Sequence, residues 1–334
     1  GGRRARKRLI PLADARRRRL QIDWAAYAPP KPNLPGVKSW QNFPIAQLRG
    51  FIDWTPFFTA WELSGKFPRI LDDPSVGESA RQLYQDAQAM LDRIIAENWL
   101  TAKAVIGLFP AHSAGDDVIV YADESRTERL TTVHFLRQQM EKPPGRPNLS
   151  LADFIAPEET GIPDYLGMFV VTTGIGLAEK VAEFEAQHDD YNAILLKALA
   201  DRLAEAFAEV MHGCVRREYW GYAPDETLDN DALIAEAYRG IRPAPGYPAC
   251  PDHTEKGELF RVLDATNQAG VTLTESYAML PAAAVSGYYF AHPQASYFGI
   301  GRIAEDQLSD YAQRKGMDLK TAERWLASNL GYES

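Results

Sequence analysis

The residues with the clearest chemical potential form a ten-residue loop, Arg-Pro-Ala-Pro-Gly-Tyr-Pro-Ala-Cys-Pro, at positions 242–251. Its prolines fix φ and remove backbone donors, so the segment is neither a helix nor a central strand. Gly246 is the position that can take a positive φ or let a ligand approach the backbone. Arg242 and Tyr247 add a guanidinium and an aromatic ring. The segment is therefore either a stiff surface connection or a rigid loop that holds a small ligand with a carboxylate and a flat ring.

Carboxylates elsewhere in the chain could complete such a site. Asp53 lies in the aromatic segment Phe51-Ile-Asp-Trp-Thr-Pro-Phe-Phe58, where it either caps the following helix or faces a ligand ammonium. An acidic stripe also recurs at i, i+4 spacing: Asp201, Glu205 and Glu209. Such a stripe is usually solvated, but like charges at this spacing repel, so a partner or ligand would compensate them.

Other motifs are weaker. Gly174-Ile-Gly176 follows an expected strand, but position 179 is Glu, so the dinucleotide fingerprint is incomplete and a turn is favoured. The six histidines are scattered, and His188-Asp189-Asp190 is more typical of a polar helix turn than of a metal site. Tyr297 is expected in a strand and is more typical of core packing than of ligand contact. We predict no metal site and no catalytic nucleophile.

The elements that must position these residues are helices and strands in local groups. Strands are expected at 104–110, 117–121, 151–154, 165–172, 271–274, 286–290 and 297–303, and 125–139 is either a strand or a helix. Helices are expected at 44–50, between 58 and 65, and at 78–96, 178–217, 229–238, 257–266, 304–315 and 319–327, after an extended strap at 23–37. This order favours an α+β fold in which long helices pack around a twisted, mostly antiparallel sheet.

Composition excludes several classes of protein. The 334 residues are 46% hydrophobic and 24% charged, as in soluble globular proteins. No apolar run reaches the roughly 18 residues of a membrane span. The two cysteines, Cys214 and Cys250, are too few for a disulfide framework and indicate a reducing, cytoplasmic compartment.

Charge is distributed unevenly along the chain. Residues 1–20 carry nine Lys or Arg and one acid, a net charge of +8, which leaves −17 on the remainder. A basic arm is typical of nucleic-acid binding or of a solvated linker. No aromatic residues are interleaved with these charges, and the acidic remainder would repel phosphate. We therefore expect a linker, with no nucleic-acid and no membrane partner.

Several long motifs resemble, in the same order, the C-terminal activation domain of cobalamin-dependent methionine synthase. They are the proline loop with His253-Thr-Glu-Lys256, the aromatic segment 51–58, the stretches 197–207 and 219–224, and a closing Asn-Leu-Gly-Tyr at 329–332. The resemblance covers the chain from Asp23 to Tyr332. It implies a basic interdomain linker at residues 1–22 and an activation domain at residues 23–334.

The resemblance also implies a function. In that family the domain binds S-adenosylmethionine, whose methyl group restores a cobalamin that has been oxidised to inactive cob(II)alamin in the neighbouring cobalamin-binding domain. Reduced flavodoxin or a related flavoprotein supplies the electron. Matched motif by motif, the ligand contacts are Asp53, Glu205, Arg242, Ala244, Gly246, Tyr247 and Tyr297. Asp201 would face the cobalamin-binding domain.

The residue types fit this ligand. Arg242 can meet the carboxylate with a bidentate fork, and Asp53 or Glu205 can hold the ammonium. The backbone of residues 244–246 can present hydrogen-bonding groups to adenine, and Tyr247 can cover the ring or the sulfonium. The cofactors carry the chemistry, so no residue needs an acid–base role. An acidic flavoprotein would require local basic patches on this acidic chain.

Two other functions remain open. A self-sufficient S-adenosylmethionine-dependent methyltransferase for small molecules would need a nucleophile or base, and a glycine-rich Rossmann motif would be expected; none is evident. A docking module without a ligand would not need the ligand-binding positions, and all of them are present. We expect the isolated domain to bind its ligand without turnover of its own, as part of a methyltransferase.

Overall fold

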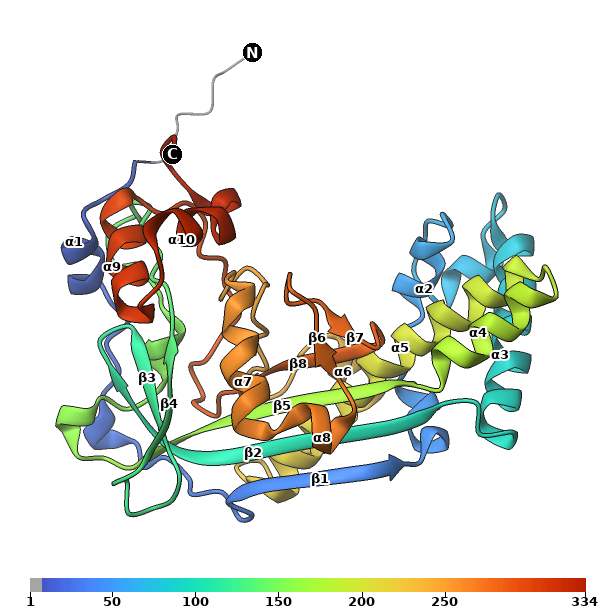
Figure 1. The fold of residues 1–334 in the computed structure, drawn as a ribbon, viewed down its shortest axis with the longest axis horizontal. Coiled ribbons are helices and arrows are strands. Elements are labelled where there is room, and N and C mark those ends of the chain that lie inside the picture. Colours follow the sequence, from blue (N-terminus) through green and yellow to red (C-terminus); the bar gives the residue numbers. More distant parts are fainter. Residues whose placement is uncertain (1–7) are drawn as a thin grey trace.

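The computed structural model describes residues 8–334, and an antiparallel sheet runs through its centre (Figure 1). The sheet has the order β4-β3-β2-β5-β8, and β1 pairs with the edge of β2 that also carries β3. Its strands are β1 Gly36–Phe43, β2 Thr101–Ala114, β3 Asp117–Tyr121, β4 Arg129–His134, β5 Asp164–Ile175 and β8 Ala284–Tyr289. β6 Thr272–Leu273 and β7 Met279–Leu280 form a separate pair. The predicted α+β class is confirmed.

The sheet is covered on both faces. Helix α5, Asp190–Cys214, packs on one face, and α7, Lys256–Leu263, and α8, Ala265–Ala269, pack on the other. Successive side chains of a strand point to opposite faces. Within β2, Ile106 accordingly belongs to one hydrophobic core and Val105 to the other. Burial on both faces explains why β5 is an almost continuous apolar run.

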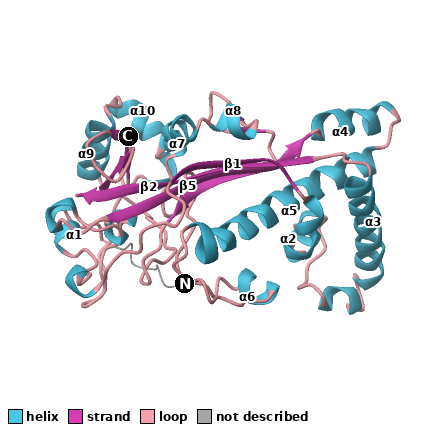
Figure 2. Ribbon diagram, turned by 90° about the horizontal axis from the view of Figure 1, so that it is seen from below, coloured by secondary structure: helices cyan, strands magenta, loops and turns pink. Residues whose placement is uncertain are grey.

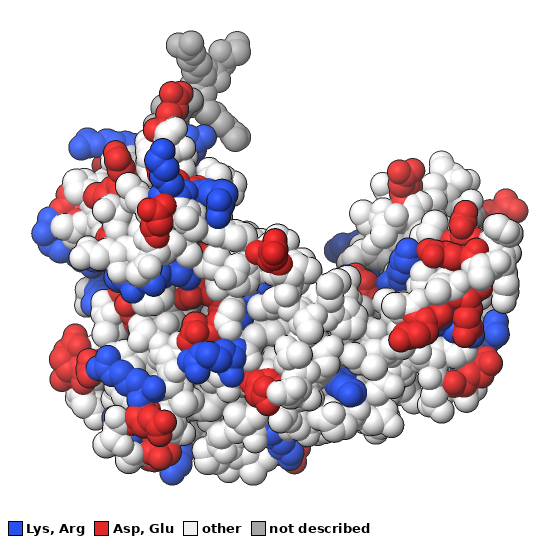
Figure 3. All heavy atoms as spheres, viewed as in Figure 1, with Lys and Arg blue, Asp and Glu red and all other residues white. Residues whose placement is uncertain are grey.

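Most of the remaining helices gather at the two ends of the sheet. The full set of these helices is α1 Leu12–Arg17, α2 Thr55–Ala60, α3 Gly77–Ala96, α4 Leu177–Ala186, α6 Asn230–Ile234, α9 Glu305–Lys315 and α10 Leu319–Trp325. Helices α2, α3 and α4 lie at one end, and α1, α9 and α10 lie at the other with β3 and β4 (Figure 1). Seen from below, α5 runs along the sheet towards α3 (Figure 2). The two ends rise on either side of a hollow (Figure 3).

The predicted long helix at 178–217 is two helices. α4 ends at Ala186, His188 takes a φ of +56°, and the Asp189 carboxylate then caps α5 by accepting a hydrogen bond from the Asn192 N–H. After α5, the chain makes a π-helical turn at Val215–Tyr219. His188-Asp189-Asp190 is therefore a polar turn between helices, as the sequence favoured.

Two predicted strands are wrong. Leu151–Phe154 is a 3-10 turn, because Ser150 and Asp153 form a capping box around it. Residues 297–303 form no ladder in the described chain, although Ile303 makes an isolated bridge with Leu330.

Other boundaries also differ from the predictions. Residues 125–139, left open between helix and strand, contain β4. The strap at 23–37 ends in a strand that was not predicted, β1. The predicted helix at 257–266 is interrupted at Asp264, where φ is +50°. The short helix at 44–50 is a pair of 3-10 turns.

The described half of the basic arm packs on the domain. Helix α1 buries Leu12 and Ala15, and Arg16 forms ion pairs with Asp116 at 3.0 Å and Asp310 at 2.7 Å. The arm begins with four basic residues that lie outside the described part of the chain: Arg3, Arg4, Arg6 and Lys7. The assignment of residues 1–22 to a linker stays a prediction. Across residues 8–334, no helix has both the length and the apolar character needed to cross a bilayer.

Candidate functional site

The proline loop is a compact turn fastened to the sheet. The carbonyl of Pro243 accepts a hydrogen bond from the N–H of Tyr288, in β8, at 2.9 Å. Within the loop, the Gly246 N–H donates to the Cys250 carbonyl at 2.8 Å, and the Cys250 thiol donates to the Ala244 carbonyl at 3.1 Å. These bonds fix a backbone that is neither helix nor strand, as predicted.

Position 246 requires glycine for two reasons, its backbone conformation and the close approach of a neighbouring ring. Its φ is +95°, and an added Cβ would lie 2.2 Å from the His253 ring. That imidazole contacts the Lys256 ammonium at 2.9 Å, and Lys256 donates to the Tyr277 carbonyl at 2.9 Å. The His253-Thr-Glu-Lys256 segment therefore supports the turn at Gly246.

Arg242 is held by contacts from several elements. Its Nη1 lies 2.5 Å from a carboxylate oxygen of Glu209, 3.0 Å from Nδ1 of His212 and 3.0 Å from the Tyr238 hydroxyl. Its backbone N–H donates to the Tyr297 hydroxyl at 2.8 Å. Burial alone would lower the pKa of Arg242, but the neighbouring Tyr238, Glu209 and Tyr297 raise it, so the guanidinium is a permanent cation.

The three acids of the α5 stripe become less exposed from Asp201 to Glu209. The Asp201 side chain is 59% exposed and pairs with Arg202 at 2.9 Å, whereas that of Glu209 is 8% exposed and pairs with Arg242. Glu205 lies between them and is half-buried. Asp201 and Glu209 are thus paired with arginines of this chain, whereas the expectation was a partner or ligand.

Five of the seven predicted ligand residues line one cavity of about 500 Å³: Glu205, Arg242, Ala244, Tyr247 and Tyr297. Gly246 belongs to the same loop but does not line the cavity itself. Tyr247 and Tyr297 are 63% and 41% exposed, so neither ring is core packing, against the expectation for Tyr297. The cavity thus joins a cation, a carboxylate and two aromatic rings.

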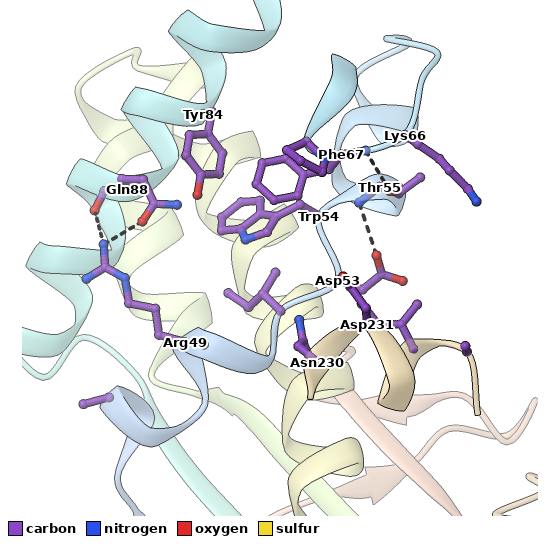
Figure 4. Close-up of a pocket in the computed structure, with 16 residues that line it drawn as sticks. Arg49, Asp53, Trp54, Thr55, Lys66, Phe67, Tyr84, Gln88, Asn230 and Asp231 are labelled. Atoms are coloured by element: carbon purple, nitrogen blue, oxygen red, sulfur yellow. Dashed lines mark hydrogen bonds between the residues drawn. The ribbon is translucent and has the colours of Figure 1, made fainter. Parts of the chain in front are cut away.

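Asp53, the seventh residue, lines a larger cavity of about 1060 Å³ (Figure 4). Its carboxylate accepts a hydrogen bond from the Thr55 N–H, the first of α2, at 3.3 Å, although the N-cap residue of that helix is Trp54. Asn230 and Asp231, from α6, approach it across the cavity (Figure 4). The structure therefore does not place Asp53 in the cavity of Arg242.

The end of α6 lies between the two cavities. Ile234 and Ala235 line the larger one, and the next residue, Glu236, lines the smaller one. Glu236 has a φ of +57°, which is uncommon for a residue with a side chain. Glu236 was not among the predicted site residues, because an acid in an acidic helix carries no special pattern.

His212 and Tyr238 were also not predicted from the sequence, although the spacing of His212 could have indicated it. His212 follows Glu205 and Glu209 on the same face of α5, at i+7 and i+3. Burial and the charges of Arg242 and Arg216 hold the pKa of His212 well below its usual value, so the ring is neutral. Burial raises the pKa of Glu205, although Arg202 and Arg242 oppose that effect.

The other motifs of the sequence are structural. Gly176, with a φ of +96°, starts α4 where an added Cβ would lie 2.5 Å from the Trp99 carbonyl, so the glycine pair is a turn. Among residues 8–334, no group of three or more His, Cys, Asp or Glu side chains is arranged to hold a metal ion. Both cysteines are free thiols.

The fold and the cavities define an α+β ligand-binding domain whose smaller cavity sets Arg242 among acids and aromatic rings. A family model, the activation domain of vitamin B12-dependent methionine synthase, matches residues 44–316. The chain belongs to this family, and the predicted resemblance is confirmed.

A solved structure agrees with the family model. The crystal structure of the MetH reactivation domain bound to AdoHcy has a TM-score of 0.95 to this chain and is 53% identical in sequence. The match covers 97% of this chain and 99% of that one. The likeness therefore extends beyond the family model to nearly all of the chain.

Proposed function

We propose that this activation domain binds S-adenosylmethionine between α5 and the proline loop and presents its methyl group to a cobalamin held by a neighbouring domain. The observation that carries the proposal is the convergence of Glu205, Arg242, Ala244, Tyr247 and Tyr297 on one cavity. The similar MetH reactivation domain was solved with AdoHcy, the molecule that remains when S-adenosylmethionine loses its methyl group.

The geometry suggests a role for each charged residue. The carboxylate and ammonium of the ligand share one carbon atom, so an acid that lines the cavity of Arg242 should hold the ammonium. Glu205 lines the cavity of Arg242, whose charge acts to lower the pKa of Glu205, whereas Asp53 lines the other cavity. We therefore assign Glu205 to the ammonium and leave Asp53 for a polar group farther along the ligand. Tyr247 can cover the sulfonium or adenine.

The domain acts by positioning. A cobalamin in the neighbouring domain, reduced by an electron from flavodoxin or a related flavoprotein, would supply the nucleophile for the methyl group, and the sulfonium would leave as the thioether of AdoHcy. The residues of this chain bind the donor and fix its orientation, which is where an enzyme gains most when the reactants are already activated. We infer that the isolated domain binds without turnover and that it works in the cytoplasm, in keeping with its free thiols.

Calorimetry with S-adenosylmethionine tests the proposal, and Arg242→Lys is the sharpest variant. Lysine keeps the charge that compensates buried Glu209 but loses the planar fork that matches a carboxylate. Affinity should fall by about 10–100-fold in a variant that remains folded. Absence of binding to the folded wild-type domain would contradict the proposal.

A second experiment separates this function from a self-sufficient methyltransferase. Incubation with S-adenosylmethionine carrying a labelled methyl group and with candidate small-molecule acceptors should transfer no label unless the cobalamin-binding domain and a reductant are present. Transfer without cobalamin would favour the alternative.

A further inference from the structure

The contacts of the Arg242 guanidinium are strongly one-sided. Glu209, His212 and Tyr238 all approach Nη1, at 2.5, 3.0 and 3.0 Å. Within residues 8–334, Nε and Nη2 of Arg242 make no hydrogen bond. The Nε–Nη2 edge of a guanidinium offers two parallel N–H groups, the pair that meets a carboxylate in bidentate fashion. The partners thus occupy Nη1 and leave the two parallel donors of the Nε–Nη2 edge available to a ligand.

The partners of Nη1 are themselves fixed by packing. The His212 ring stacks on Tyr289 of β8 at 5.2 Å with an interplanar angle of 17°, and it meets the Tyr238 ring edge-on at 4.9 Å. The guanidinium of Arg216 lies 4.0 Å from the centre of the Tyr238 ring. Rotamers locked in this way can hold a side chain in one orientation.

The protonation state of His212 suits this arrangement. A neutral ring has one donor and one acceptor nitrogen, and Nδ1 faces the N–H of Arg242, so Nδ1 is the acceptor. The hydrogen then lies on Nε2, which is buried and has no hydrogen-bond partner in the described chain. An unsatisfied buried donor is costly, so another role must offset that cost. The role that the structure offers is the contact with Arg242.

We propose that Glu209, His212 and Tyr238 are positioning residues that hold Arg242 by Nη1 so that its Nε–Nη2 edge is presented to the carboxylate of the ligand. The inference rests on the proposed binding of S-adenosylmethionine and deepens it. None of the three residues needs to touch the ligand. Their effect on binding is exerted through Arg242 and is therefore specific for the carboxylate.

Decarboxylated S-adenosylmethionine provides the test, since it keeps the sulfonium, ammonium and adenosine and lacks the carboxylate. The wild-type domain should bind the carboxylated ligand more tightly, and Arg242→Lys should remove most of that preference. Tyr238→Phe and His212→Leu should each weaken S-adenosylmethionine binding by about tenfold. Both variants should change the affinity for the decarboxylated ligand less than twofold.

Two further variants serve as matched controls. His212→Asn puts an amide oxygen near the position of Nδ1, so it should restore most of the affinity that His212→Leu loses. Tyr191→Phe removes a hydroxyl from the exposed start of α5, where it bonds to Asp86 at 2.6 Å, and should affect neither ligand.

The outcomes separate the two proposals. The positioning role would be overturned if Tyr238→Phe and His212→Leu lost affinity equally for both ligands. It would also be overturned if they lost affinity for neither. Equal affinity of the wild type for both ligands would also overturn it, while leaving S-adenosylmethionine binding intact. Failure of the wild type to bind either ligand would overturn the proposed function itself, and the inference with it.

Discussion

At the scale of single residues, Gly246 meets two constraints at once. Its φ is +95°, and an added Cβ would collide with the His253 ring at 2.2 Å. Gly246→Ala should lower the free energy of unfolding by about 1–3 kcal/mol, because backbone strain and overpacking both oppose the native loop. Chemical denaturation of the two proteins measures the difference.

The double variant Gly246→Ala/His253→Ala separates those two causes. It removes the ring that an alanine at 246 would meet and keeps the unfavourable φ, so it should recover only part of the loss, relative to His253→Ala alone. Complete recovery would show that the left-handed backbone costs nothing at this position. No recovery would show that the ring is not the obstacle.

Glu205 should give ligand binding a dependence on pH. Burial raises its pKa above the usual 4.5, despite Arg202 and Arg242. If the ionised carboxylate holds the ammonium, affinity should fall as the pH drops through this raised pKa, since the proton must leave before the ligand binds. Calorimetry over a pH series should show this fall, and Glu205→Gln should flatten it. An unchanged profile in that variant would assign the titration to another group.

The sequence predicted much of this site and missed a definable part. The proline loop was recognisable because prolines and a glycine specify backbone geometry locally. The role of Glu209 was not, since its partner Arg242 lies 33 positions away along the chain and only tertiary packing brings the two together. The separation of Asp53 from the cavity of Arg242 is also a property of packing, which no motif encodes.

At the scale of elements, α5 joins the site to the sheet. One face packs on β5 and β8, and its acids and His212 meet the loop that carries Arg242. Helical periodicity predicted this face but not the break at His188, because a solvated polar turn does not disturb the apolar spacing on either side. Similarly, the 3-10 turn at Leu151–Phe154 was mistaken for a strand because a short buried apolar run fits both.

A buried ionic cluster links the elements at the end of the sheet that holds α1 and α9. The guanidinium of Arg137 is fully buried and contacts Asp116 at 2.7 Å and Asp153 at 2.8 Å. Arg16 of α1 reaches the same Asp116 and also Asp310 of α9. Burial would raise the pKa of Asp116, but Arg137 and Arg16 hold it below its usual value. The cluster thus links α1 to the body of the domain.

Arg137→Met should destabilise the domain by about 3–5 kcal/mol, because it leaves two buried carboxylates without their main partner. Arg17→Met, a change at a side chain that is 72% exposed, is the matched control and should have little effect. The contribution of ionised Asp116 to the free energy of unfolding is complete above its pKa in the unfolded chain, about 3.9. This contribution is lost as the pH falls through the lower pKa that Asp116 has in the folded domain. Urea denaturation should therefore show a smaller deficit for Arg137→Met in acid than at pH 7. A deficit that does not depend on pH would show that lost packing, and not charge, is the cause.

At the scale of the whole molecule, charge and shape bear on how a second domain could approach. Acidic side chains gather over the end formed by α2, α3 and α4, whereas basic ones are mixed with them at the other end (Figure 3). Asp201 remains exposed at the outer end of the α5 stripe, one helical turn from Glu205. It lines neither cavity of the proposed ligand site. A residue in this place can contact an incoming domain without taking part in ligand binding.

Asp201→Asn should therefore separate ligand binding from reactivation. In the isolated domain it should change the affinity for S-adenosylmethionine less than twofold, because the lost charge is exposed and, among residues 8–334, forms an ion pair with Arg202 alone. In the full-length parent protein it should slow the reductive recovery of activity by about tenfold, the effect of losing one hydrogen bond to a charged group at the interface. The recovery can be followed from the visible spectrum of the cobalamin.

Glu183→Gln is the matched control for the charge change, since Glu183 is an exposed acid of α4 that pairs with Lys180 and lines neither cavity of the proposed ligand site. It should leave both binding and reactivation unchanged. Normal recovery in Asp201→Asn would remove this residue from the interface. A parallel loss of ligand affinity would instead place Asp201 within the binding site, and the two measurements together distinguish a docking contact from a ligand contact.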